Sequence, residues 1–222
     1  MDTPQSQNSN PCHAYPEEFL RQLSEMGFPL STKQLNALTQ YLRLIQAYNK
    51  SVGVVSRQEV AHLWERHLVD SLSLLPVLDK ILPVGGHHLD IGSGGGFPAI
   101  PLALMFQDRN FDLIERSSKK CGFLRKVVAM MSSENIQIHH GTFPELALGL
   151  RPGTITARAV EKPALIHKAI ANFMAENTCF VAQCAPEAPL SSEMFHVEQY
   201  QDQMSARGWR RGDLFLVKRR TS

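Results

Sequence analysis

The chain has 222 residues, of which 43% are hydrophobic, and its formal net charge is +2. This length suits one domain with a modest extension, and the apolar content excludes a largely disordered chain. The longest apolar runs, such as residues 100–106, fall far short of the roughly 20 residues that span a bilayer. The polar segment 1–11 lacks the pattern of a secretory signal. These features predict a cytoplasmic protein without membrane association, monomeric by default.

The four cysteines, at positions 12, 121, 179 and 184, show no Cys-x-x-Cys spacing and no matched pairs. The histidine doublets at 87–88 and 139–140 fall beside predicted strands, where adjacent rings point to opposite faces. Neither set has the ligand spacing of a zinc site. The sequence therefore predicts no metal site.

The first third of the chain is predicted to be helical. Apolar residues recur at spacings of three and four over 16–26, 34–45 and 60–72. Ser31 and Ser56 are each followed three residues later by Gln or Glu, which is the pattern of a capping box. We expect two or three amphipathic helices, the last of which ends at Pro76.

From His87 onward, short apolar runs alternate with helical stretches. Strands are predicted at 88–91, 112–114, 136–139, 154–157, 179–182 and 214–218, and helices at 98–106, 118–131 and 163–174. This alternation predicts an α/β fold with a mostly parallel, Rossmann-like sheet and helices on both faces. We divide the chain into an N-terminal helical extension, 1–84, packed on a core domain, 85–222.

A glycine-rich loop follows the first predicted strand. Asp90 closes the strand, and Gly92, Gly94 and Gly96 precede a helix. Glycine lets a backbone turn tightly and approach a ligand closely. The dinucleotide-binding pattern Gly-x-Gly-x-x-Gly would need a third glycine at position 97, where Phe97 stands. The observed spacing is instead that of S-adenosylmethionine-dependent methyltransferases, so we assign these five residues to cofactor binding.

A carboxylate is expected at the end of the second strand, and Glu115 stands there. Its two oxygens suit the vicinal hydroxyls of a ribose. Without the glycine loop, the same Glu would be interpreted as a surface residue capping the next helix.

Basic residues cluster in two places. Segment 116–126 holds five basic residues and no acid, including Lys119, Lys120 and Arg125, and segment 207–220 holds six with one Asp. Both clusters are compatible with an RNA-facing edge that contacts phosphates. Such clusters are more often solvated helix faces, so charge alone does not establish an RNA partner.

Several stretches resemble the RsmG (GidB) family, which methylates nitrogen 7 of a guanine in bacterial 16S ribosomal RNA. The resemblance covers roughly 48–182, and Gly-Phe-Pro-x-Ile-Pro and His-x-x-Asp-Ser are its most particular patterns. The matching stretches are Tyr48-Asn-Lys, His67-Leu-Val-Asp-Ser-Leu, Leu89-Asp-Ile-Gly-Ser-Gly-Gly-Gly-Phe-Pro-Ala-Ile-Pro-Leu-Ala, Lys119-Lys-Cys-Gly-Phe-Leu-Arg, His140-Gly and Arg158-Ala.

The resemblance implies a class I methyltransferase that uses S-adenosylmethionine and acts on 16S ribosomal RNA of the small subunit. It implies that Gly92 and Phe97 contact the cofactor, that Phe143 and Pro144 flank its adenine, and that Arg158 lies near the reacting end. Three segments depart from the family pattern, namely 53–55, 142–145 and 183–185. The last lacks a lysine that is expected near the substrate.

Three side chains have two interpretations each. Arg158, the candidate catalytic residue, orients the substrate or the methionine carboxylate, or it forms an ion pair with Asp90 or Glu161. His67 and Asp70 lie three apart on one predicted helix face. They shape the RNA entrance or lock the helical extension onto the core.

Alternative functions remain open at this point. They are a methyltransferase of the same fold acting on another RNA or a small molecule, and a non-catalytic cofactor-binding or ribosome-associated relative. A nicotinamide-dependent oxidoreductase is disfavoured by Phe97 at the third glycine position.

Overall fold

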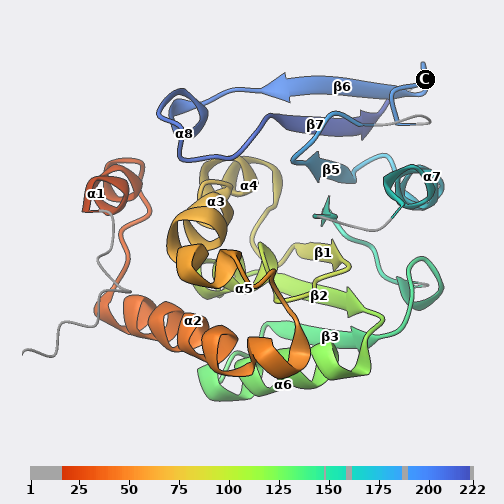
Figure 1. Ribbon diagram of the computed structural model, residues 1–222. Coiled ribbons are helices and arrows are strands. Elements are labelled where there is room, and N and C mark those ends of the chain that lie inside the picture. Colours follow the sequence, from red (N-terminus) through yellow and green to blue (C-terminus); the bar gives the residue numbers. More distant parts are fainter. Residues whose placement is uncertain (1–16, 148, 159–161, 187–189, 221–222) are drawn as a thin grey trace, which may run out of the picture.

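The computed structural model describes residues 17–147, 149–158, 162–186 and 190–220. Their strands form one sheet in the order β3–β2–β1–β4–β5–β7–β6 (Figure 1). The parallel strands are β1 (His87–Ile91), β2 (Asn110–Glu115), β3 (Ile136–His140), β4 (Thr154–Thr156) and β5 (Cys179–Ala182). The antiparallel strands are β6 (Phe195–Tyr200) and β7 (Leu214–Arg219). The predicted α/β fold with a mostly parallel sheet is confirmed.

Strand β6 was not predicted. It pairs with β7 alone and forms one edge of the sheet. Phe195 is buried and Val197 half-buried, whereas His196 and Glu198 between and after them are exposed. This alternation is the pattern of a strand with one solvated face, so the signal was present in the sequence.

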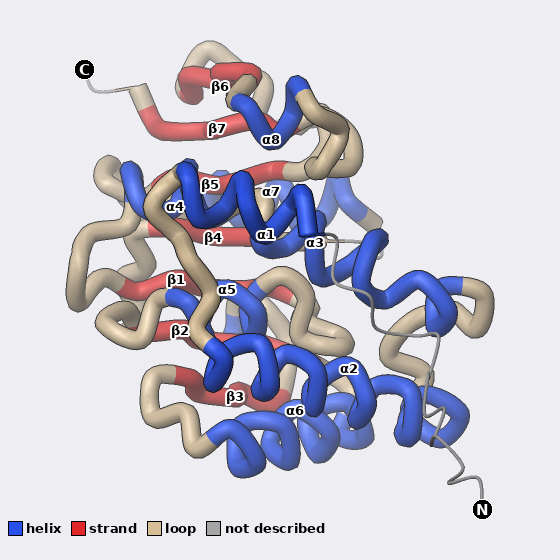
Figure 2. The backbone as a smooth tube through the Cα atoms, turned by 90° about the vertical axis from the view of Figure 1, so that its left-hand side faces the viewer, coloured by secondary structure: helices blue, strands red, loops and turns tan. Residues whose placement is uncertain are grey.

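Helices cover both faces of the sheet (Figure 2). On one face, α5 (Ala99–Met105) and α6 (Ser118–Met131) contribute to the larger apolar cluster. On the other face, α7 (Pro163–Phe173) packs against a smaller cluster that includes Leu89, Ile155 and Phe180. Successive strand residues point to opposite faces, so strands such as β2, β5 and β7 contribute to both clusters.

The N-terminal helices join the larger cluster. They are α1 (Glu17–Glu25) and α2 (Thr32–Val52). Ser31 caps α2 in the predicted capping box, in which its hydroxyl accepts from the Gln34 backbone and the Gln34 side chain accepts from the Ser31 backbone. Helix α2 ends at Gly53, whose φ of +67° is readily adopted by glycine.

The stretch predicted as one helix up to Pro76 is irregular. It consists of a 3₁₀ turn (Glu59–His62), a π-helical turn (Trp64–Leu68), α3 (Val69–Leu72) and α4 (Leu75–Ile81). Pro76 lies in the first turn of α4, where a missing backbone N–H costs nothing. The prediction that Pro76 ends the helix was wrong, because proline is tolerated at a helix start as well as beyond its end.

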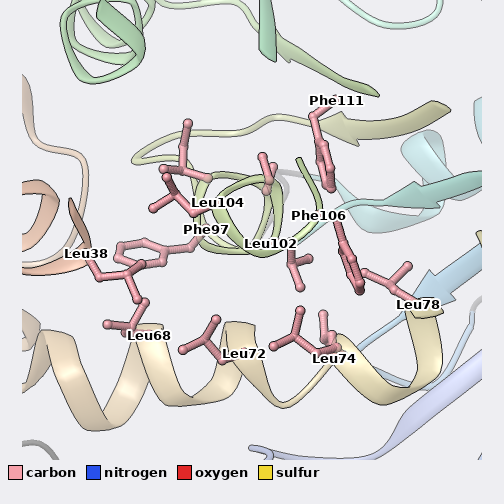
Figure 3. Packing of buried hydrophobic residues seen from close by; sticks show 14 of the residues in the cluster. Leu38, Leu68, Leu72, Leu74, Leu78, Phe97, Leu102, Leu104, Phe106 and Phe111 are labelled. Carbon is pink, nitrogen blue, oxygen red and sulfur yellow. The ribbon is translucent and has the colours of Figure 1, made fainter. Parts of the chain in front are cut away.

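The apolar stripe of this irregular stretch nevertheless packs as predicted. Leu68, Leu72 and Leu78 point toward α5 and toward Phe106 (Figure 3). All three leucines are fully buried, and each contributes roughly 1.5–3 kcal/mol relative to an exposed side chain. This packing fixes 64–72 beside the glycine loop. No helix in the described segments is long and apolar enough to cross a membrane.

Candidate functional site

Two adjoining cavities lie at the carboxyl ends of β1, β2, β3 and β4. Each has a volume of about 470 Å³, and both are lined by Gly92 and Lys120. Strand β1 pairs with β2 on one side and β4 on the other, so the chain reverses direction across the sheet here. Ligands of open α/β sheets bind at such a switch point. We call the cavity beside Glu115 the first cavity and the one beside Arg158 the second cavity.

The glycine loop adopts the backbone that its sequence predicts. Gly92, Gly94 and Gly96 have φ values of +72°, +57° and +98°. The Gly92 N–H donates to the Ile114 carbonyl at 2.8 Å, which ties the loop to β2. A Cβ on Gly96 would lie 2.5 Å from Ile100 Cγ1, so the loop approaches α5 more closely than any side chain allows. Gly92 and Gly94 line cavity walls, whereas Gly96 lies behind them.

Glu115 joins the loop to the next helix. Its Oε2 accepts from the Gly94 N–H at 2.9 Å, and its Oε1 accepts from the Ser117 N–H at 2.8 Å. The side chain is buried but lines the first cavity. A carboxylate oxygen has two acceptor sites, so each oxygen retains one for a hydroxyl in that cavity.

Asp90 lies beneath the loop and lines neither of the two cavities. Its Oδ1 accepts from the Thr156 hydroxyl at 2.6 Å, and its Oδ2 has no hydrogen-bond partner. Burial raises its pKa to about 6, although the Thr156 and Ser93 hydroxyls oppose that shift. The predicted cofactor contact is therefore not a direct one in this geometry, in which Asp90 links β1 to β4.

Phe143 and Pro144 differ in position. Phe143 lines the first cavity, and its ring packs edge-on against Phe173 at a centroid distance of 5.2 Å. Pro144 is exposed and outside the wall of that cavity. Of the two predicted adenine neighbours, the structure brings Phe143 alone to the cavity.

Arg158 lines the second cavity, close to the glycine loop. Its predicted ion-pair partners were Asp90 or Glu161. The guanidinium instead pairs with Asp70, with Nη1 2.9 Å from Oδ2. Asp90 was the wrong partner because it is turned toward Thr156 on β4. Glu161 lies outside the described residues.

Asp70 had two interpretations, a place at the RNA entrance or a contact that locks the helical extension onto the core, and its contacts fit the second. Its side chain is 1% exposed, because α3 turns it inward against three other segments. Besides Arg158, it accepts from Gln183 Nε2 at 3.2 Å and from the Arg211 backbone N–H at 2.8 Å. Asp70 therefore cannot contact a macromolecule in this structure.

His67 reaches the second cavity from the π-helical turn. Its ring lies against Phe97 at a centroid distance of 5.0 Å and an interplanar angle of 30°. Burial, followed by the charge of Arg158, lowers the pKa of His67 to about 4, so the ring is neutral at pH 7. Together, His67 and Phe97 place two aromatic rings in the cavity wall.

The departing segment 53–55 also lines the second cavity. The Asn49 side chain holds it, because its Oδ1 accepts from the N–H groups of Val54 at 2.8 Å and Val55 at 3.0 Å. Its Nδ2 donates to the Val55 carbonyl. Asn49 was not among the predicted site residues, although it lies within the matching Tyr48-Asn-Lys stretch.

The two basic clusters have different surroundings. In 116–126, Lys120 lines both cavities, while Lys119 and Arg125 are exposed on α6 outside their walls. The second cluster, 207–220, is largely committed to the fold. Two of its arginines form ion pairs, Arg207 with Glu18 and Arg210 with Asp202. Two others donate to backbone carbonyls. Arg219 donates to those of Met174 and Ala171, and Arg220 to that of Phe195.

Arg211 and Lys218 are the exposed members of the second cluster that remain. The Arg211 backbone N–H donates to Asp70, the ion-pair partner of Arg158. Arg211 therefore lies beside the second cavity, which Arg158 lines. The sequence contained it in a charge run, but nothing local distinguished it from its neighbours. Across the described residues, no group of three or more His, Cys, Asp or Glu side chains is placed to hold a metal ion.

Comparison with known proteins identifies close sequence relatives. Residues 34–194 match the family model of rRNA small subunit methyltransferase G (GidB). A ribosomal RNA small subunit methyltransferase G of Stutzerimonas stutzeri is 34% identical over 146 residues, which is 66% of each chain. One from Sorangium cellulosum is 34% identical over 154 residues, which is 68% of this chain and 64% of the relative. The matched part is thus just under two thirds of the length of these relatives.

Solved structures of low sequence identity share the fold. A methyltransferase from Geobacter sulfurreducens has a TM-score of 0.57 at 13% identity, covering 94% of this chain and 98% of the other. A mutant of MtNAS in complex with S-adenosylmethionine has a TM-score of 0.60 at 14% identity, covering 92% and 84%. The fold is therefore that of class I methyltransferases.

Proposed function

Because this chain belongs to the rRNA small subunit methyltransferase G family, we propose that it methylates nitrogen 7 of a guanine in 16S ribosomal RNA, with S-adenosylmethionine as the methyl donor. The observation that carries the proposal is the glycine loop tied to Glu115 at the switch point of the sheet. A ribosomal RNA substrate places the activity in the cytoplasm.

The residues of the two cavities fit this cofactor. In the first cavity, Glu115 offers two acceptor positions to the ribose hydroxyls, and Phe143 offers an apolar wall to the adenine. The positive φ angles of Gly92 and Gly94 remove side chains from the path between the cavities. The second cavity would hold the methionine part beside Arg158 and Lys120. Each cavity has the volume of a typical small-molecule site.

When bound, the cofactor supplies a methyl group on a positively charged sulfur. Guanine nitrogen 7 carries a lone pair and no proton, so the reaction needs no general base. The work of the protein is to align the nucleophile with the methyl group and to exclude water. Neutral His67 and the Phe97 ring offer an apolar face to a base, and Arg158 offers hydrogen-bond donors.

The nitrogen 7 edge of guanine faces the deep groove of double-stranded RNA, so the target is an unstacked guanine. Lys119, Lys120 and Arg125 on α6, together with Arg211, would hold phosphates around the cavities. Such binding weakens with salt. An RNA affinity that stayed flat between low and moderate salt would contradict this assignment.

The proposal is tested by transfer of labelled methyl from S-adenosylmethionine to small ribosomal subunits that lack the modification. Nucleoside mass spectrometry of the product should show 7-methylguanosine. Cofactor binding without transfer would indicate another substrate or a binding-only relative. No cofactor binding would contradict the proposal as a whole.

Arg158→Ala should abolish methyl transfer while the protein remains folded, because the guanidinium faces the second cavity. The substitution leaves the buried Asp70 carboxylate without its ion-pair partner, which costs stability. Arg158→Lys therefore serves as a second variant that retains the charge but loses the planar fork. Near-normal turnover of Arg158→Ala would rule out this role.

A further inference from the structure

Asp70 is a buried carboxylate that pairs with Arg158, a residue of the second-cavity wall, and three segments converge on it. Arg158 follows β4, Gln183 follows β5, and Arg211 precedes β7. The contacts to Gln183 and Arg211 span 113 and 141 residues of sequence. One side chain of α3 thus contacts hydrogen-bond donors from segments next to three different strands.

The two carboxylate oxygens have different tasks. Oδ2 faces the Arg158 guanidinium at 2.9 Å and the Gln183 amide at 3.2 Å, and Oδ1 faces the Arg211 backbone N–H at 2.8 Å. At 1% exposure, Asp70 has little water to compete for these contacts. An ion pair at this depth needs further hydrogen bonds to the carboxylate, and the Gln183 amide and the Arg211 backbone N–H supply them here.

Arg158 depends on this carboxylate for its orientation. Its Nη2 also donates to the Arg66 carbonyl, at the longer distance of 3.3 Å. The side chain is 19% exposed, so part of the fork faces the second cavity while the rest is held from behind. An unrestrained arginine side chain would otherwise sample many rotamers, which lowers the efficiency of any contact that depends on its position.

We propose that Asp70 is a positioning residue that fixes the Arg158 guanidinium at the wall of the second cavity and, through the Arg211 backbone, holds a second arginine beside that cavity. This proposal rests on the proposed function only for its effect on catalysis. The geometric part concerns Arg158 itself and holds for any ligand of the cavity.

Asp70→Asn is the informative substitution, because it preserves size and removes charge. The carboxylate uses both oxygens as acceptors, whereas an amide offers one acceptor and turns an NH₂ group toward a donor on the other side. Either the Arg158 contact or the Arg211 contact is lost. We expect kcat/KM for methyl transfer to fall about 100-fold, the size of effect that follows a small misplacement of a reacting group.

Asp112 provides a matched control. It is a buried carboxylate on β2 that accepts from two side chains, with His139 Nε2 at 2.7 Å and His87 Nδ1 at 3.3 Å, and it lines neither cavity. Asp112→Asn removes a buried charge of the same kind. We expect kcat/KM to stay within threefold of the wild type, measured where circular dichroism shows both variants folded.

A second readout is independent of turnover. In protein with ¹⁵N-labelled arginine, the Arg158 Nη1–H signal, identified by its loss in Arg158→Lys, should exchange slowly with water in the wild type and in Asp112→Asn, because Nη1 faces Asp70. In Asp70→Asn its exchange should accelerate at least tenfold. An inactive wild type would defeat the proposed function, yet this exchange measurement would still decide the role of Asp70.

Two results would overturn the proposal. One is an Asp70→Asn protein whose Arg158 signal and kcat/KM match those of Asp112→Asn. The other is failure to fold of both Asp70→Asn and Asp70→Glu at 25 °C, which would assign Asp70 a structural role alone. Asp70→Glu keeps the charge but moves the oxygens by one methylene, so we expect it to fold and to lose about tenfold in kcat/KM.

Discussion

The two cavities meet at Gly92 and Lys120, but different kinds of contact build them. The first cavity is framed by successive strand ends, and its central bond, from the Gly94 backbone to Glu115, spans 21 residues. The second cavity depends on side chains drawn together over much longer stretches of chain, with Asp70 at their centre. A substitution in the first should act through backbone shape, and one in the second through charge and orientation.

Gly96→Ala should have the largest effect, because it attacks the backbone of the glycine loop, which contributes to the walls of both cavities. The position has a φ of +98°, and its Cβ would lie 2.5 Å from Ile100 Cγ1. Backbone strain and overpacking each cost roughly 1–3 kcal/mol, so we expect the free energy of unfolding to fall by about 2–6 kcal/mol. Urea unfolding measures this change.

The control for Gly96→Ala is Gly122→Ala. Gly122 lies in α6, and an added Cβ there meets no atom within 4 Å. This variant should gain about 0.5–1 kcal/mol from helix propensity. If the two variants were equally stable, the loop would not be constrained as described.

The pH dependence of the unfolding free energy tests whether the Asp90 carboxylate is buried beneath the glycine loop. Its pKa is about 6 in the folded protein against an ordinary value of 3.8, so the folded state holds the proton more tightly. Stability from this group is present below pH 4 and is lost as the pH rises to about 6. We expect the unfolding free energy of the wild type relative to Asp90→Asn to fall by up to about 3 kcal/mol between pH 4 and pH 7.

Urea unfolding of both proteins at several pH values measures this difference in free energy. The protonation of all other groups affects both proteins equally and therefore cancels. A difference that did not change with pH would show that Asp90 is ionised normally. It would then have to be solvated or paired in a way that differs from the buried, half-satisfied carboxylate described above.

Glu115→Gln should sharpen the contrast between the cavities. The amide has one acceptor oxygen, so it cannot serve both backbone N–H groups and two hydroxyls. We expect the dissociation constants of S-adenosylhomocysteine and of 5′-methylthioadenosine, which lacks the carboxylate, to rise equally, by about 10- to 100-fold. Isothermal titration calorimetry measures both.

Arg158→Lys gives the opposite pattern with the same two ligands if Arg158 binds the methionine carboxylate. Only the S-adenosylhomocysteine affinity should then fall. Unchanged affinity for both ligands would assign Arg158 to the RNA substrate instead. Equal losses for both ligands would contradict the division into two cavities.

Arg211→Ala should have the smallest effect. Its exposed side chain lies beside the second cavity, where a phosphate contact contributes modestly. We expect RNA affinity to fall several-fold and the slope of log K against log salt to decrease by about one. Lys218→Ala is the control. Lys218 is also exposed, but on β7 it lies opposite Cys179, the first residue of β5, and thus at the end of that strand away from the cavities. Equal effects of the two variants would mean that nonspecific charge dominates.

The sequence by itself determined the alternation of strands and helices, the glycine loop and the acid after β2. These features depend on residues close in sequence, and periodicity or backbone preference expresses them directly. Strand β6 carried the same kind of signal and was readable in principle. The capping box at Ser31 and the apolar stripe of 60–72 are further local features that the structure retains.

Only the tertiary structure decided which charged side chains serve the site. Asp70 lies within a matching motif but is buried, and Arg158 pairs with it rather than with Asp90. Arg211 of the tail is held beside this pair by its backbone N–H. A charge has no periodic signature, and its surroundings come from segments more than 80 residues away. Long-range packing therefore fixes the second cavity, whereas local sequence fixes the first.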